Sequence, residues 1–222
     1  MPMFIALTLL TGVVDAASYL KLGHVFVANM TGNVVFLGFA LAGAQGLSAV
    51  SSLVALGAFL AGALVGGYVG SRNAAHRGHI LRNAGLVQLT LIAIALILAL
   101  ALGEPLDGAD RYALLVPMAL AMGVQNAAAQ RIAVPELTTT VLTRTLTGLA
   151  SEAGLVGGPG SKFGRRALAV AAMLLGALTG ALLALHVAIA AAFALAAAIV
   201  SAVALAAHLL SRTRAQAPWI RA

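Results

Sequence analysis

The sequence of 222 residues contains no cysteine, and only 9% of its residues are charged. The missing cysteines exclude disulfide bonds, thiolate metal ligands and a cysteine nucleophile. The shortage of charge excludes a water-soluble globular protein, because such proteins carry about 25% charged residues. An apolar fraction of 62% excludes a disordered chain as well. The composition therefore predicts a protein embedded in a lipid bilayer.

Basic residues outnumber acidic ones, with 13 Lys and Arg against 6 Asp and Glu, for a formal net charge of +7. In a membrane protein such an excess anchors cytoplasmic loops, so it does not indicate a nucleic-acid partner. The five histidines are scattered, and no phosphate-binding loop, zinc motif or nucleophile elbow is present. We therefore expect no cofactor, no metal and no catalytic activity.

The apolar runs predict an all-α protein. A spanning helix needs about 20 mostly apolar residues. Six runs meet that requirement, at 3–20, 47–71, 80–103, 110–131, 166–185 and 187–210. Two shorter apolar runs, 28–45 and 137–153, contain clusters of Asn and Thr. Whether these two short runs cross the bilayer decides the topology.

The distribution of charge favours six crossings. If both short runs cross, the twelve basic residues outside these runs divide seven to five between the two sides and show no useful bias. If both are re-entrant or broken half-helices that leave on the side where they enter, ten basic residues share one side. Only Lys21 and Arg111 then lie opposite. The positive-inside rule selects the second arrangement, with both termini cytoplasmic.

Similar short sequences recur in the two halves of the chain and in the same order. Gly12–Ala17 matches Gly123–Ala128 at an offset of 111, and Met30–Asn33 matches Leu142–Thr145 at 112. Leu60–Gly66 matches Leu174–Gly180 at 114. We predict a single membrane domain, residues 1–222, made of repeats at about 1–105 and 106–222. Each repeat would hold three crossings, so the second would run inverted relative to the first, as in many transporters.

Re-entrant segments that enter from opposite faces are expected to converge and place polar residues at mid-depth. The candidate binding or pathway residues are Asp15, Asn29, Thr31, Asn33, Gln125, Asn126, Thr140, Thr143 and Arg144. Contact with a solute and simple capping of broken helices are equal alternatives for Asn29, Thr31 and Asn33. For the Thr138–Thr140 run, the structural role is favoured.

Asp15 is the most informative single residue, because it lies within the first predicted span. A charge at that depth costs at least about 2.5–3.5 kcal/mol, so such residues face a bundle interior or a polar cavity. Arg144 is the second charge expected inside the membrane, and an Asp15–Arg144 pair would lower the cost of both. The alternatives are a static brace, or an Arg144 side chain that reaches the cytoplasmic surface.

Two glycine series have the spacing that lets helices approach closely. Gly62, Gly66 and Gly70 form one series, and Gly176 and Gly180 form the other. They predict packing faces, either within the bundle or between copies in a homo-oligomer.

Several of these blocks resemble the YoaK-type bacterial membrane proteins, a family of unknown function. The resemblance lies in Gly12-x-x-Asp15, in Val25–Asn33, in Gly123–Ala128 and in Val134–Thr143. It implies a protein of the bacterial cytoplasmic (inner) membrane and names no substrate. It also implies glycine where this chain has Arg144.

Together these features predict a transporter or channel for a small solute in the lipid bilayer, with a polar site where the repeats meet. A non-transporting membrane scaffold or regulatory subunit is the alternative. An intramembrane enzyme is the least favoured hypothesis, since catalysis would need a paired acid and base or a metal site.

Overall fold

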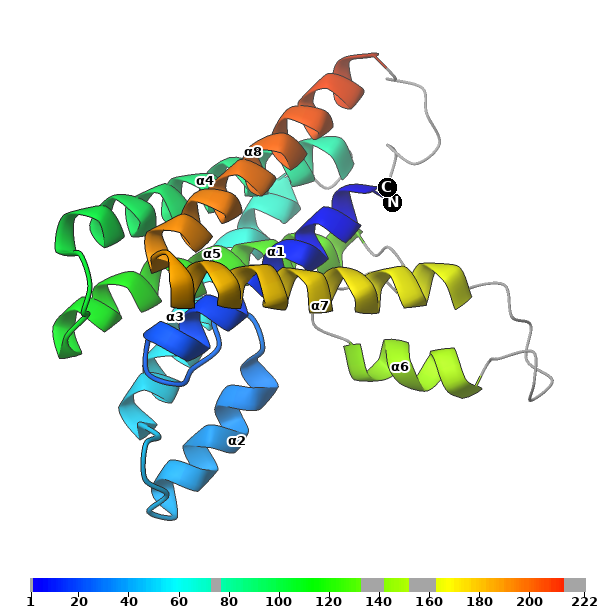
Figure 1. Cartoon of the computed structure of the whole chain (residues 1–222). Coiled ribbons are helices and arrows are strands. Elements are labelled where there is room, and N and C mark those ends of the chain that lie inside the picture. The colour runs from blue at the N-terminus through cyan, green and yellow to red at the C-terminus, as the bar shows by residue number, and fades with distance from the viewer. Residues whose placement is uncertain (1, 73–76, 133–141, 152–162, 214–222) are drawn as a thin grey trace.

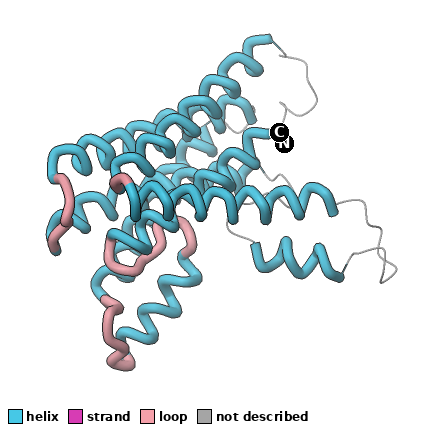
Figure 2. Tube along the Cα trace, viewed as in Figure 1, coloured by secondary structure: helices cyan, strands magenta, loops and turns pink. Residues whose placement is uncertain are grey.

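A computed structural model describes residues 2–72, 77–132, 142–151 and 163–213, and every element in these ranges is an α-helix (Figures 1 and 2). The eight helices are α1 (Pro2–Lys21), α2 (Met30–Leu41), α3 (Ala49–Arg72), α4 (Arg77–Leu102), α5 (Gly108–Ile132), α6 (Leu142–Ser151), α7 (Phe163–His186) and α8 (Ile189–Thr213).

The six predicted spans are confirmed as the six long apolar helices α1, α3, α4, α5, α7 and α8. The remaining two helices, α2 and α6, have 12 and 10 residues. At about 1.5 Å per residue they measure roughly 18 and 15 Å, about half of a hydrocarbon core roughly 30 Å thick. Neither is long enough to cross a bilayer, so the described part of the chain holds six membrane-spanning helices and two half-helices.

Large aliphatic side chains cover the outside of the bundle, as lipid contact requires. Leu64 on α3, Leu100 on α4 and Leu174 on α7 are all more than 60% exposed. Water would disfavour such a surface, whereas lipid tails do not. The helices α1 and α5 are the most buried of the six and form the centre of the bundle.

The helix ends show that α2 is re-entrant. At one end of the bundle, Lys21 Nζ lies 2.6 Å from Glu104 Oε2, and the Ile189 N–H donates to Glu104 Oε1 at 2.7 Å. Ser51 and Tyr112 pair their hydroxyls at 3.3 Å near the starts of α3 and α5. We call this the Lys21 end. Because α1 ends here and α3 begins here, the chain between them, including α2, leaves on the side where it enters.

The same reasoning applies to α6. Helix α5 runs away from the Lys21 end, and α7 runs back toward it to reach α8. The chain between α5 and α7, including α6, therefore also enters and leaves on one side. Helices α1–α4 and α5–α8 consequently run in opposite senses, which is the inverted arrangement predicted for the two halves.

Two close helix crossings hold the bundle together, α3 against α5 and α7 against α1. A Cβ added to Gly62 would collide with the carbonyl oxygen of Leu120, and one added to Gly176 would collide with that of Leu9. Gly62 and Gly176 differ by 114 positions, and Leu9 and Leu120 differ by 111. These are two of the three offsets of the sequence matches, so the same crossing occurs twice.

Other contacts at the crossings repeat in the same way. The backbone at Gly66 lies against Val124, and that at Gly180 lies against the equivalent Val13. A Cβ on Gly123 would collide with the carbonyl oxygen of Phe59. These repeated contacts support a duplication. They also place the glycine faces within one chain, so an oligomer would have to use a different surface.

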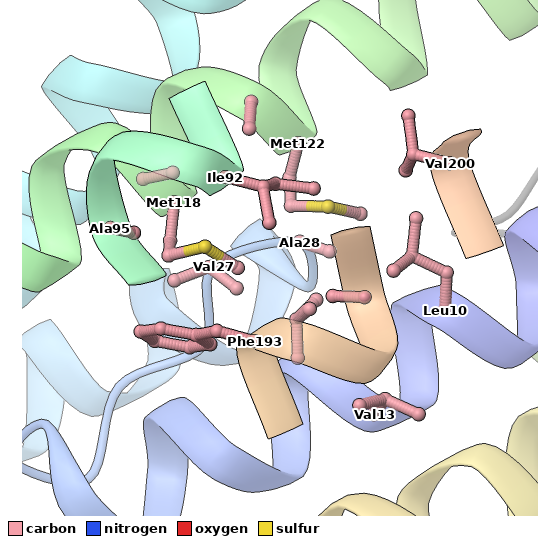
Figure 3. Packing of buried hydrophobic residues seen from close by; sticks show 14 of the residues in the cluster. Leu10, Val13, Val27, Ala28, Ile92, Ala95, Met118, Met122, Phe193 and Val200 are labelled. Carbon is pink, nitrogen blue, oxygen red and sulfur yellow. The ribbon is translucent and has the colours of Figure 1, made fainter. Parts of the chain in front are cut away.

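The centre of the bundle is apolar and includes part of the loop before α2. Val27 and Ala28 are at most 1% exposed. They lie beside Ile92, Met118 and Phe193, which come from α4, α5 and α8 (Figure 3). Residues 22–29 therefore fold back from the Lys21 end into the core.

The expected convergence of the two half-helices is wrong. Helix α2 packs against α3, whereas α6 packs against α7, and Figure 1 shows the two apart. The seven-residue loop 42–48 makes α2 an antiparallel neighbour of α3, and apolar side chains occupy the centre. Residues on α2 and α6, such as Thr31 and Thr143, therefore do not share one polar chamber.

Candidate functional site at the re-entrant loop

Asp15 lies at the centre of the candidate site, where it holds the re-entrant loop. Its side chain is 4% exposed. Oδ1 accepts hydrogen bonds from the backbone N–H of Val27 at 3.0 Å and from that of Ala28 at 2.8 Å. Among the described residues, the second carboxylate oxygen, Oδ2, has no hydrogen-bond partner. Asp15 is thus a buried acid with one oxygen bonded to the loop and one buried oxygen that has no hydrogen-bond partner among the described residues.

The loop reaches Asp15 because the chain reverses sharply after α1. Gly23 and His24 have positive φ angles of 93° and 57°. Phe26 then stacks on both Tyr19 and Phe36, with ring centroids 5.2 and 5.5 Å away. These aromatic contacts attach the returning loop to both α1 and α2.

Asn33 braces this loop from the other side. Its Oδ1 accepts from the N–H of Phe26 at 2.9 Å, and its Nδ2 donates to the carbonyl of Phe26 at 2.7 Å. The side chain is completely buried. Asn29 and Thr31 are exposed, and the Asn29 side chain makes no capping bond to α2. Of the three candidates on this segment, Asn33 is thus the one whose side-chain amide is hydrogen-bonded to backbone groups of the loop.

A second buried polar group links α1, α4 and α5. Gln88 Nε2 donates to Gln125 Oε1 at 2.7 Å, and Gln125 Nε2 donates to Thr11 Oγ1 at 3.2 Å. Gln88 and Gln125 are at most 3% exposed. Asn126, the repeat equivalent of Asp15, is half-buried and donates to the carbonyl of Met122 at 2.9 Å. We call Thr11, Gln88 and Gln125 the glutamine network.

The second half-helix contributes less to the described site. Thr143 is exposed on α6, and its carbonyl accepts from the hydroxyl of Thr147. Thr140 and the Arg144 side chain lie outside the described residues. The predicted Asp15–Arg144 pair therefore stays a prediction, while the recorded partners of Asp15 are backbone N–H groups.

A family model described as a protein of unknown function, DUF1275, matches residues 3–206. The chain belongs to the DUF1275 family. It is 33% identical over 146 residues to the UPF0700 transmembrane protein YoaK of Bacillus subtilis (strain 168). That match covers 66% of this chain and 64% of YoaK. No solved structure matches the chain.

In this DUF1275 protein, sequence reasoning missed four buried polar residues on α1 and α4. Thr8, Thr11 and Ser18 lie on the same face of α1 as Asp15 and are at most 4% exposed. Their spacing of three or four residues along the helix was the available signal. Gln88 had no such pattern, because most of its neighbours in the run 80–103 are apolar.

Within the described residues, two cavities lie at the Lys21 end, and Asp15 lines neither of them. The larger one, of about 450 Å³, is lined by residues before α2, after α2 and at the start of α5. The smaller one, of about 330 Å³, is lined by Lys21, Glu104 and Arg111 among others. Among the described residues, no group of three or more His, Asp or Glu is placed to hold a metal ion.

Proposed function

We propose that this DUF1275 protein passes a small solute across the membrane without chemical conversion, as a transporter or channel. The proposal rests above all on Asp15, a buried acid in a spanning helix with a free oxygen. Structural acids inside membranes are costly and are normally paired, so an acid with an unused oxygen indicates a functional role.

The surroundings of Asp15 support passage along the interface between the two halves. The glutamine network lies one turn away on α1, since Thr11 and Asp15 are four residues apart. Amide and hydroxyl groups at this depth can replace part of the hydration shell of a polar solute. The loop 22–29 closes the route toward the Lys21 end, because Val27 and Ala28 fill the centre.

In this proposal the loop 22–29 acts as a gate. Asp15 holds it by two hydrogen bonds to backbone N–H groups, and Asn33 holds it by two more. Withdrawal of the loop from Asp15 would expose both the carboxylate and the glutamine network. Non-helical backbone at membrane depth is tolerated where it lines such a route.

We place the protein in the bacterial inner membrane, with both termini cytoplasmic. The observation in favour is the charge asymmetry between the two ends of the bundle. Arg72, Arg77 and Arg131 lie at helix ends opposite the Lys21 end, which carries Lys21 and Arg111. By the positive-inside rule the Lys21 end then faces away from the cytoplasm.

A non-transporting scaffold is the second candidate, and Asn33 favours it. Its amide is fully used to brace Phe26, and both described cavities lie at one end. In that case Asp15 would act only as an anchor for the loop.

Flux through proteoliposomes separates the two candidates. Purified protein is reconstituted, and uptake is followed for a panel of labelled anions, sugars and amino acids. Asp15→Asn is the decisive variant, because an amide oxygen still accepts from Val27 and Ala28 while the charge is lost. The repeat equivalent, Asn126, already carries that amide. Asp107→Asn is the matched control, since it removes the same charge at an exposed loop position.

Transport predicts solute uptake that Asp15→Asn abolishes at unchanged expression and melting temperature, and that Asp107→Asn leaves intact. A scaffold predicts no uptake by any of the proteins, with Asp15→Asn affecting stability alone. The second outcome would refute the proposed function.

A further inference from the structure

The cavity of about 450 Å³ at the Lys21 end has the size of a small-molecule site. Three parts of the chain converge on it, namely the turn after α1, the loop between α2 and α3, and the first turn of α5. Leu20 and Leu47 supply apolar wall, while Ser48, Ser51 and Tyr112 supply hydroxyls. The lining is more polar than apolar, which suits a ligand that has a charged or polar group.

Arg111 is the charged residue common to both cavities. Its Nε donates to the carbonyl of Leu106 at 3.1 Å, which fixes the plane of the guanidinium. Among the described residues, no acceptor is recorded for its two terminal nitrogens. The guanidinium is therefore held in place with its outer donors unused, as in a site that binds a carboxylate or a phosphate.

Hydroxyl groups add further donors to the same cavity. The hydroxyls of Ser51 and Tyr112 lie 3.3 Å apart. Tyr112 directly follows Arg111 on α5, so the phenol and the guanidinium enter the site from one helix turn. Either hydroxyl can be the donor in that pair, so the other hydroxyl keeps its hydrogen for an anion.

The acids at this end favour a singly charged anion. Glu104 is bonded to Lys21, which neutralises both charges. Asp107 and Asp110 flank the start of α5 but line neither cavity. Their field would repel phosphate, which carries more charge than a carboxylate, whereas a planar carboxylate matches the fork of Arg111.

We propose that this cavity binds a small organic monocarboxylate, with the carboxylate on Arg111 and the apolar part of the ligand against Leu20 and Leu47. The Ser51–Tyr112 hydroxyl pair donates one further hydrogen bond to its oxygens. This binding is independent of transport, since it requires neither movement of the loop nor passage through the bundle.

Isothermal titration of the full chain in lipid nanodiscs tests the site with benzoate as the probe. Benzamide is the neutral probe of the same shape, and inorganic phosphate is the competing anion. Arg111→Gln removes the guanidinium, and Arg111→Lys keeps the charge but loses the fork. Arg72→Gln is the matched control, because Arg72 lies at the opposite end of α3 and stacks on Tyr68.

We expect saturable binding of benzoate and none of benzamide. Arg111→Gln should weaken benzoate binding by about tenfold or more, and Arg72→Gln should leave it unchanged. If Arg111→Gln fails to fold, Arg111→Lys decides, with an expected loss of several-fold. The proposal is overturned if the wild-type protein does not bind benzoate, or if it binds benzamide equally well or phosphate more tightly. It is also overturned if folded Arg111 variants bind benzoate with wild-type affinity. Loss of flux with retained benzoate binding would refute transport alone.

Discussion

Replacement of Gly62 by alanine tests the packing of the bundle. Gly62 lies in the middle of α3, where α3 crosses α5. A Cβ at this position would overlap the carbonyl oxygen of Leu120, and its next neighbours are the backbone C and Cα of Leu120 at 2.8 Å. Backbone inside a helix cannot rotate away as a side chain can. The two helices must therefore separate over their whole contact.

The structure sets the size and sign of the effect. Overpacking of this kind typically costs about 1–3 kcal/mol. The better helix propensity of alanine returns about 0.8–1.0 kcal/mol at most. We expect Gly62→Ala to lower the free energy of unfolding by up to about 2 kcal/mol after both effects. Gly176→Ala should cost a similar amount, because its Cβ would meet the equivalent carbonyl of Leu9.

Gly57 provides the matched control on the same helix. It is exposed, and a Cβ there would meet nothing within 4 Å. Gly57→Ala should therefore be neutral or stabilising by up to about 1 kcal/mol. Unfolding in mixed detergent micelles, followed by circular dichroism, gives the free energies. Equal stabilities of Gly62→Ala and Gly57→Ala would refute the close crossing, and a neutral Gly176→Ala would refute its repetition.

Two further predictions concern single side chains at the Lys21 end and the loop. Asn33→Ala should lower the free energy of unfolding by about 1–3 kcal/mol, because both hydrogen bonds to Phe26 are lost. The control, Asn29→Ala, should change it by no more than about 0.5 kcal/mol. Similar losses from both variants would contradict the role of Asn33 in holding the loop. Burial raises the pKa of Glu104, but hydrogen bonds from Lys21 and the Ile189 N–H outweigh it and lower the pKa below its usual value. The resulting stabilisation, about 0–1 kcal/mol for an exposed pair, is present at neutral pH and disappears as the pH falls through that lowered pKa. Wild type and Glu104→Gln should therefore converge in stability in acid, and a gap that persists there would refute the assignment.

The sequence was sufficient to predict the six crossings and the inverted order of the halves. Long apolar runs are a strong signal, because every residue of a spanning helix contributes to it. The distribution of basic residues then decided that the short runs do not cross. Both inferences depend on sums over many residues, so errors at single positions do not matter.

The placement of the half-helices could not be predicted in the same way. The polar residues of both short runs suggested one chamber, yet α2 packs on α3 and α6 on α7. Nothing in the sequence indicated that Val27 and Ala28 occupy the centre instead. The partner of Asn33 was equally hidden, because Phe26 contributes only its backbone, which is the same for every residue type.

Labelling of single cysteines tests the central claim, that the chain through α2 returns to the face from which it entered. The native chain has no cysteine, so each introduced thiol is the only one. His24→Cys lies at an exposed position in the turn between α1 and α2, Ala44→Cys lies in the loop after α2, and Ser71→Cys lies at the far end of α3. With a membrane-impermeant maleimide, we expect His24→Cys and Ala44→Cys to react from one side of the membrane and Ser71→Cys from the other. Reaction of His24→Cys from the side opposite Ala44→Cys would show that α2 crosses the bilayer and would contradict the re-entrant topology.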